Sequence, residues 1–280
     1  MARAQLSPLL DSLKNNCPSS SWYGPHLVNE IQFEWAETKS RRNEQRIVAY
    51  RKDDPYKIPR WWKPLHRHKS RYRMKQIGRI QRLIEYRKRA RYFITFTVDP
   101  KRFDNDRQAH DGLKEAWNKI RKRLQRINPD VQGITATEPQ KQGQPHMHVI
   151  LWNIYIPKYL KWASETYPIS AGRIHIKPAK AGNKGAVSYL AKYITKGTSD
   201  DFTLGCLSRW KARTLNPFGK EIRDLLGPLV VKNSTKEWEK GIFLRDYDEA
   251  CYELGEEIAE MIYYPPENGP PMTESILICP

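Results

Sequence analysis

Cysteine is scarce in this sequence, and its four positions are far apart. Cys17, Cys206, Cys251 and Cys279 form no CxxC pair, which argues against a zinc ribbon or a disulfide framework and favours a reducing cytoplasm. Long hydrophobic runs are also missing: no stretch of about 18 apolar residues occurs, and the N-terminus lacks the apolar segment of a signal peptide. We therefore expect a soluble intracellular protein with no membrane partner.

Acidic residues are few outside the C-terminal end. The 280 residues include 49 Lys or Arg and 31 Asp or Glu, a formal net charge of +18. Nine acids and one base lie from residue 244 onwards, so the first 243 residues carry a net charge of +26. With 39% hydrophobic and 29% charged residues, the chain has the composition of a folded globular protein.

The densest basic stretch, residues 57–91, has fourteen Lys or Arg and a single acid, Glu85, with four aromatic residues interleaved. Cations that neutralise phosphates, next to rings that stack on bases, favour nucleic-acid binding. A solvated charged face or a flexible basic arm is the alternative. The candidate DNA-binding residues of this stretch are Arg71, Arg73, Lys75, Arg87, Lys88 and Arg89.

Hydrophobic periodicity changes in a regular order along the middle of the chain. Period-two patterns predict strands at residues 92–98, 131–138, 146–152 and 172–177. Helical spacing predicts helices at 113–127, 157–165 and 186–196, the last ending at Gly197. The order β-α-β-β-α-β-α predicts an α+β fold, in which an antiparallel sheet carries flanking helices on a ferredoxin-like plan.

The two ends of the chain are predicted to be mainly helical extensions of this core. Residues 1–90 are expected to form a basic extension, with short helices before residue 57 and a polar helix over residues 71–91. Residues 91–200 form the predicted core, and residues 201–280 form a C-terminal extension with an acidic tail.

Two histidines and a carboxylate form the first candidate site. His146 and His148 are separated by one residue on a predicted strand, so both imidazoles point to the same face. Glu138 ends the preceding strand, and a hairpin would bring it beside them. Zinc, iron, manganese or magnesium would suit this donor set; the alternative is surface histidines beside a solvated glutamate. His66 and His68 repeat the spacing without a strand pattern, and we interpret them as unrelated.

A predicted helix supplies the second candidate site. Tyr189 and Tyr193 lie four residues apart, so both hydroxyls leave the same helix face, and Lys192 and Lys196 each follow a tyrosine by three residues. A phenol with a pKa of about 10 is a poor nucleophile at neutral pH, and a nearby cation favours the phenolate and stabilises charge on an attacked phosphodiester. The alternative is that one ring packs in the core and the lysines are solvated.

Three segments, in this order, resemble motifs of the HUH endonuclease superfamily and within it the rolling-circle replication initiators (Rep proteins) of small plasmids and phages. FITFT at 93–97 is similar to the first strand motif. EPQKQGQPHMHV at 138–149 is similar to the histidine-pair motif with its upstream carboxylate, and YLAKYITK at 189–196 resembles the two-tyrosine helix of the phage enzymes. The resemblance covers about residues 90–200, under half of the chain.

The resemblance implies a site-specific nickase and ligase that acts on single-stranded DNA at a replication origin. In such an enzyme, Glu138, His146 and His148 would bind Mg2+ or Mn2+, which polarises the scissile phosphate. Tyr189 or Tyr193 would attack in line, leaving a 5′-phosphotyrosine and a free 3′-hydroxyl. The residues that would assist the phenolate or position the phosphate are Lys192 and Lys196.

The same resemblance indicates partners, because no GxxxxGK[S/T] helicase motif occurs in the chain. A host helicase and a DNA polymerase are therefore expected, in the cytoplasm of a prokaryotic host. A single-strand transposase of the same superfamily is the nearest alternative. A non-catalytic nucleic-acid-binding module on an RRM-like sheet is the next, although its RNP signature is missing. A His/Glu metal hydrolase ranks last, because it leaves the tyrosine helix unexplained.

Overall fold

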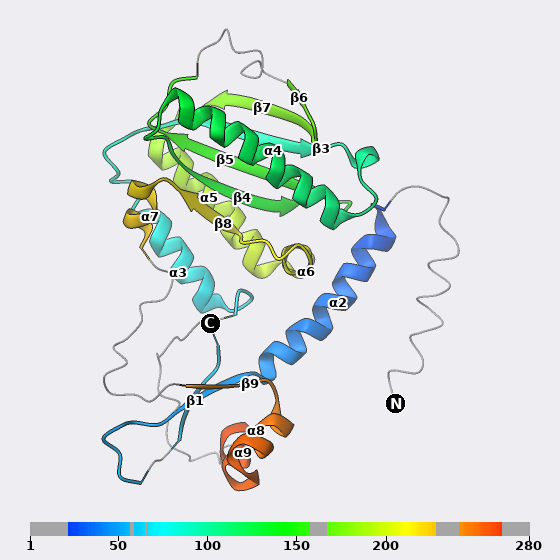
Figure 1. Ribbon diagram of the computed structural model, residues 1–280, viewed down its shortest axis with the longest axis vertical. Coiled ribbons are helices and arrows are strands. Elements are labelled where there is room, and N and C mark those ends of the chain that lie inside the picture. The colour runs from blue at the N-terminus through cyan, green and yellow to red at the C-terminus, as the bar shows by residue number, and fades with distance from the viewer. Residues whose placement is uncertain (1–21, 57–58, 65, 157–166, 228–240, 265–280) are drawn as a thin grey trace.

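The computed structural model describes residues 22–56, 59–64, 66–156, 167–227 and 241–264. Its largest feature is a six-stranded antiparallel sheet in the order β6-β7-β3-β5-β4-β8. Helices lie against both faces of this sheet (Figure 1), so the predicted α+β class is confirmed. The strands are β3 Ala90–Val98, β4 Gln132–Pro139, β5 Pro145–Trp152, β6 Tyr167–Ile169, β7 Gly172–Pro178 and β8 Leu215–Phe218.

The four strands predicted from alternation are confirmed, with boundaries that differ by at most two residues. The two edge strands β6 and β8 were not predicted. β8 has the sequence LNPF, which is too short to show alternation and contains Pro217, a residue that sheets tolerate at an edge. The predicted helix at 157–165 lies outside the described residues.

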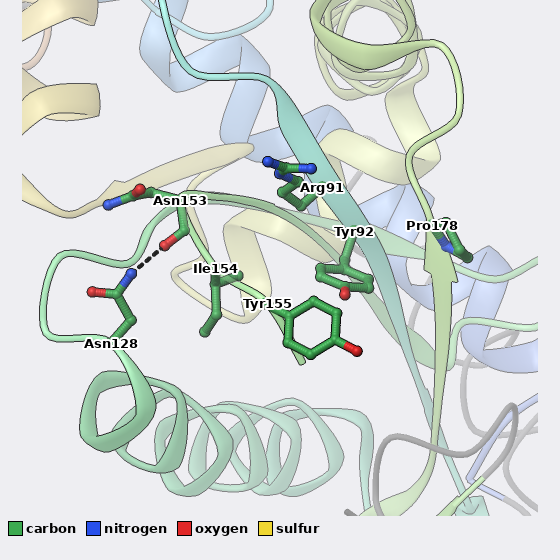
Figure 2. A pocket seen from close by; sticks show the side chains of 7 residues that line it. All are labelled: Arg91, Tyr92, Asn128, Asn153, Ile154, Tyr155 and Pro178. Atoms are coloured by element: carbon green, nitrogen blue, oxygen red, sulfur yellow. Dashed lines mark hydrogen bonds between the residues drawn. The ribbon is translucent and has the colours of Figure 1, made fainter. Parts of the chain in front are cut away.

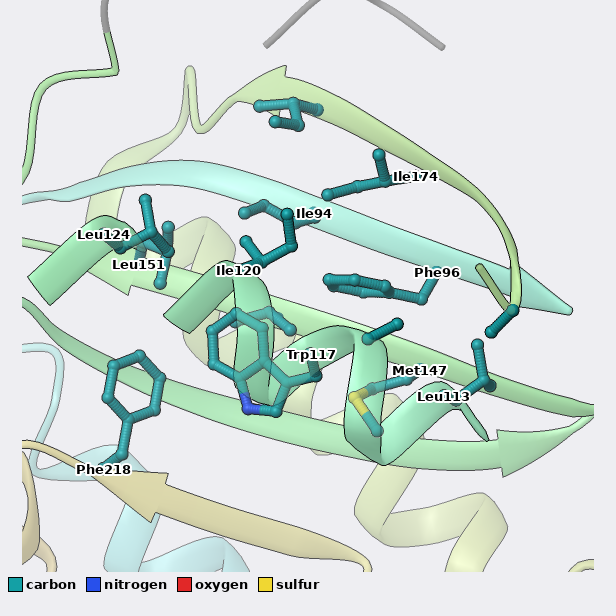
Figure 3. Close-up of a cluster of buried hydrophobic side chains, with 14 of the residues drawn as sticks. Ile94, Phe96, Leu113, Trp117, Ile120, Leu124, Met147, Leu151, Ile174 and Phe218 are labelled. Carbon is teal, nitrogen blue, oxygen red and sulfur yellow. The ribbon is translucent and has the colours of Figure 1, made fainter. Parts of the chain in front are cut away.

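One face of the sheet is covered by α4, Asp106–Ile127. Even-numbered β3 residues such as Ile94 and Phe96 point to this face and pack against Trp117 and Ile120 of the helix (Figure 3). The helix begins seven residues earlier than predicted, because the side chain of Asn105 caps it by accepting a hydrogen bond from the backbone of Gln108.

The other face carries α3 Ser70–Gln81, α5 Gly182–Ser199 and α7 Lys220–Leu226. Ile150 and Trp152 of β5 point to this side and pack among apolar residues of those helices. Because strand side chains alternate, His146 and His148 share the face of Ile150, so the histidine pair and α5 lie on the same side of the sheet.

Three helix predictions were wrong. The helix predicted over 71–91 ends at Gln81, and the side chain of Asn183 then binds the backbone of Tyr86, Lys88 and Ala90 and holds the chain that leads into β3. In place of short helices near the N-terminus, α2 runs unbroken over Pro25–Glu44.

The helix predicted to end at Gly197 continues to Ser199 as α5. Gly197 is buried inside it, and a Cβ there would lie 2.8 Å from Cγ2 of Thr214. Glycine therefore serves close packing at this position, and not helix termination.

A second, smaller sheet joins the two ends of the chain. Its order is β2-β1-β9, with β1 Arg46–Ala49, β2 Arg60–Trp62 and β9 Ile242–Leu244, and α8 Tyr247–Leu254 and α9 Glu256–Tyr263 follow. Helix α2 extends from the large sheet to this smaller one (Figure 1) and packs on α6, Asp201–Arg209. The domain boundaries at residues 90 and 200 stay predictions; β8, from beyond residue 200, is part of the large sheet.

Among the helices that the structure describes, none combines the length and the apolar character needed to cross a membrane.

Candidate functional site

The β4–β5 hairpin brings the carboxylate and the histidine pair together. Glu138 lies directly opposite His146 in the register, and His148 follows on the same face. The turn between the strands contains Gly143, whose φ of 91° favours glycine. A Cβ at this position would also lie 2.6 Å from Cδ2 of Leu27, so α2 packs closely against the turn.

His148 is buried and lies at the centre of the site. Its Nε2 atom is 3.1 Å from Oε1 of Glu138, and its Nδ1 atom is 3.0 Å from the hydroxyl of Tyr189. Because a carboxylate only accepts hydrogen bonds, Nε2 carries the proton, and in the neutral ring Nδ1 then accepts from the tyrosine. The three side chains form one chain of hydrogen bonds from phenol through imidazole to carboxylate.

Lys196 contacts the second oxygen of the same carboxylate. Its ammonium group donates to Oε2 of Glu138 at 3.0 Å, one α5 turn beyond Tyr193. Burial raises the pKa of Glu138, but hydrogen bonds and positive charge from His148 and Lys196 outweigh that effect and hold this pKa below its usual range. Glu138 is therefore a carboxylate at neutral pH.

The two tyrosines of α5 differ in their surroundings. Tyr189 is partly exposed, and its ring lies edge-on against Phe93 at 4.9 Å between centroids. Tyr193 is only 4% exposed and stacks on the ring of His148 at 4.5 Å and 24°. Burial raises the pKa of both phenols, so each is protonated at neutral pH. Of the two hydroxyls, that of Tyr189 is the one hydrogen-bonded to His148.

His146 is held by residues that the sequence analysis did not single out. Gln140 donates to its Nδ1 atom at 3.0 Å, and the hydroxyl of Thr97 lies 3.4 Å from the same atom. Thr95 lies 3.3 Å from Nδ1 of His148 in the same way. Burial lowers the pKa of His146 to about 4. The alternation of FITFT already places both threonines on the face opposite to that of Phe96, so their position was available from the sequence.

The donor chemistry of Glu138, His146 and His148 suits a divalent cation, because two imidazoles and a carboxylate share one sheet face. The described arrangement uses the carboxylate differently, since its oxygens face His148 and Lys196. Within the described ranges, no group of three His, Cys, Asp or Glu side chains is gathered as an ion would require.

The predicted DNA-binding residues are spread over two segments. Arg71 is exposed, and Arg73 and Lys75 are half-buried, all on α3. Of the others, Lys88 lies 2.6 Å from Glu221 and Arg87 lies 3.5 Å from it. The third, Arg89, donates to the backbone carbonyl of Lys180. None of the six contacts the histidines or tyrosines through a described hydrogen bond.

The remaining predicted residues take different positions. Lys192 is exposed on α5 and forms no ion pair with the described part of the chain. His66 and His68 stack on each other between β2 and α3, at 5.6 Å, with His68 next to Asn43. The structure thus brings Glu138, His146, His148, Tyr189, Tyr193 and Lys196 into one cluster, with Lys192 at its margin.

A separate cavity of about 510 Å³ opens at the far end of β3 (Figure 2). Asn128 donates to the backbone carbonyl of Asn153 beside it at 2.6 Å. Tyr92 on its wall is paired with Leu151, whereas Thr97 is paired with His146 at the opposite end of the strand. The cavity is therefore distinct from the cluster; its lining residues are Arg91, Tyr92, Asn128, Asn153, Ile154, Tyr155 and Pro178.

Comparison with known families gives one match. A family model for replication-associated proteins of the ORF2 type matches residues 91–198, under half of the chain. The matched segment begins in β3 and ends in α5, so it spans the histidine pair and both tyrosines. No curated protein and no solved structure matches the chain. The similarity supports a role in the initiation of DNA replication and an interaction with DNA.

Proposed function

We propose that the chain is a metal-dependent, site-specific nickase and ligase that starts rolling-circle replication on single-stranded DNA at an origin. The observation that carries the proposal is the hydrogen-bond chain from Tyr189 through His148 to Glu138, with Lys196 on the same carboxylate. A partly exposed phenol joined to a base and a cation is the arrangement needed for a tyrosine nucleophile. The similarity to replication-associated proteins supports a role for this chemistry in replication.

Tyr189 is proposed to make the first attack. Its hydroxyl contacts Nδ1 of His148, and its side chain is accessible, whereas Tyr193 is buried against the His148 ring. In this first cleavage Tyr193 is a positioning residue, because its stacked ring fixes the orientation of the imidazole. The two tyrosines therefore take different roles in the first round.

The raised pKa of Tyr189 means that its proton must leave during the reaction. The Nδ1 atom of His148 is placed to take it, and Glu138 stabilises the resulting imidazolium through the Nε2 proton. The phenolic oxygen then forms a bond to phosphorus, and the bond from phosphorus to the 3′ oxygen breaks. The products are a 5′-phosphotyrosine and a 3′-hydroxyl that takes up a proton and primes synthesis.

Lys196 is proposed to stabilise negative charge near the attacked phosphate, with Lys192 at the exposed margin of the same helix. Glu138, His146 and His148 are the residues that would hold Mg2+ or Mn2+, which supplies charge stabilisation at a phosphoryl oxygen when bound. A host helicase and a polymerase would then extend the 3′-hydroxyl.

The proposal is tested by incubating the full chain with a pool of single-stranded DNA oligonucleotides and Mn2+, followed by a denaturing gel and peptide mass spectrometry. We expect a covalent adduct on Tyr189 that EDTA abolishes. Cleavage without an adduct would mean that water attacks and would overturn the tyrosine mechanism. An adduct formed by the Tyr189→Phe variant on Tyr193 alone, at the rate of the unaltered chain, would overturn the assignment of the first nucleophile.

A further inference from the structure

The face of the large sheet that carries the histidine pair continues, beyond β3, onto a row of basic side chains. Strand β7 alternates Arg173, His175 and Lys177 with Ile174 and Ile176. The two isoleucines are buried with the residues of α4. The three basic side chains therefore point to the opposite face, which is the face of the candidate site.

The strand register places this row beside the site. Arg173 lies opposite Thr97, which in turn lies opposite His146. His175 lies opposite Thr95 in the next such row of the sheet, and that row continues to the neighbour of Tyr189, His148. With neighbouring strands about 4.8 Å apart, the backbone of Arg173 is about 10 Å from that of His146.

The row is open to solvent and carries free charge. Arg173 and Lys177 are exposed and His175 is half-buried. None of the three makes an ion pair or a hydrogen bond through its side chain with another residue in the part of the chain that the structure describes. Phe93, which packs against the Tyr189 ring, lies directly opposite Lys177 and adds an aromatic side chain to the same surface.

Other basic residues near this sheet are already occupied. Lys88 pairs with Glu221, and Arg79 donates to the backbone carbonyls of Leu226 and Gly227. A cation whose charge is already compensated inside the protein has less to offer a phosphate than an exposed, unpaired one. The unpaired bases next to the candidate site are therefore those of β7, which the sequence analysis did not include among its DNA-binding residues.

We propose that Arg173, His175 and Lys177 form a phosphate-binding track that holds single-stranded DNA against β7 and leads it to Tyr189. The inference rests on the proposed function, because it names the surface by which the same site takes its substrate. Arg173 and Lys177 bind backbone phosphates without reading base sequence, and His175 lies between them in the row that leads to His148. Phe93 offers a ring for a base to stack on.

The test uses the full chain and a fluorescent oligo-dT of about 15 nucleotides, with EDTA present so that no cleavage occurs. The variant Arg173→Gln/Lys177→Gln removes two charges from the track. The matched control, Lys122→Gln/Arg126→Gln, removes two exposed charges from α4 on the other side of the sheet. Fluorescence anisotropy gives the Kd of each protein over a series of salt concentrations.

We expect the track variant to lower the slope of log Kd against log salt by about 1.4 and to weaken binding about twentyfold at about 0.1 M salt, because two phosphate contacts are lost. The control should keep both values of the unaltered chain. The charge-preserving variant Arg173→Lys/Lys177→Arg should retain the slope; it also shows whether the track variant fails through folding, which its melting temperature checks directly.

The outcomes separate the two proposals. A track variant that matches the control, while the unaltered chain binds oligo-dT and forms the Tyr189 adduct, overturns the track and leaves the proposed function standing. An unaltered chain that neither binds oligo-dT nor forms the adduct overturns the proposed function. A track variant that loses affinity for oligo-rU but not for oligo-dT overturns single-stranded DNA as the occupant of the track.

Discussion

The ammonium group of Lys196 lies 3.0 Å from Oε2 of Glu138. The carboxylate that the proposed metal site needs is therefore engaged by a cation of the protein itself. An incoming divalent ion would compete with the lysine for this oxygen, and a displaced lysine would become available to a phosphate. Lys196 thus connects metal binding with substrate binding through one carboxylate.

The variant Lys196→Met removes the competing cation. We expect it to bind Mn2+ about threefold more tightly, since a partly exposed ion pair contributes about 0.5–1 kcal/mol, and to cleave DNA more slowly. Isothermal titration calorimetry without DNA measures the first effect, and a single-turnover cleavage assay measures the second. Lys192→Met is the matched control on the same helix; weaker Mn2+ binding by Lys196→Met than by this control would contradict the competition.

Phenylalanine substitutions separate the two tyrosines. Tyr189→Phe removes the hydroxyl next to His148 and should lower the rate of the first nick by at least about 1000-fold, as expected when a nucleophile is lost. Tyr193→Phe keeps the ring that stacks on His148 and should change that rate by about threefold or less. A labelled origin strand on a denaturing gel measures both rates, and equal losses in the two variants would contradict the division of roles.

The site was predictable from the sequence to the extent that it depends on local spacing. Alternation placed His146 and His148 on one strand face, the hairpin placed Glu138 beside them, and the helical repeat placed Tyr189 and Tyr193 on one face of α5. These relations lie within an element or between neighbouring strands, and sequence spacing determines them. Whether the cluster catalyses the predicted reaction stays a prediction.

Relations between distant segments could not be read in the same way. The sequence shows the alternation of Arg173 with Ile174, but only the pairing of β7 with β3 shows that Arg173 lies in the same cross-strand row as His146. The pairing of Glu221 with Lys88 joins residues more than a hundred positions apart, and no spacing rule predicts it. The basic stretch around residues 57–91 therefore looked more available to DNA than it is.

Acid should destabilise the fold through buried neutral histidines. His110 is 3% exposed, stacks on Trp210 at 5.4 Å, and has a pKa lowered by burial to about 4. Between pH 6.5 and 4 the unfolded chain binds a proton there that the folded chain does not, so stability falls as the pH drops through this range. The contribution of His110 is on the order of 3 kcal/mol.

His110→Phe keeps an aromatic ring beside Trp210 and removes the titration. Melting temperature measured from pH 7 to pH 4 should fall less steeply in this variant than in the unaltered chain. Some slope should persist, because burial also lowers the pKa values of His66, His68 and His146 to about 4. Parallel curves for the variant and the unaltered chain would refute the assignment to His110.

Asp106 should be the residue whose loss most weakens the attachment of α6 to α4. Its carboxylate is 1% exposed and accepts hydrogen bonds from Nε1 of Trp210 at 2.6 Å and from Nε of Arg209 at 3.2 Å. Asp106→Ala leaves a buried indole N–H and a guanidinium without this partner, which we expect to cost about 3–5 kcal/mol of unfolding free energy. Asp111→Ala, on the exposed side of the same helix, should cost less than about 1 kcal/mol because its pair with Lys114 is solvated. Urea unfolding of both variants measures the difference, and similar losses would show that the buried carboxylate does not join the two helices.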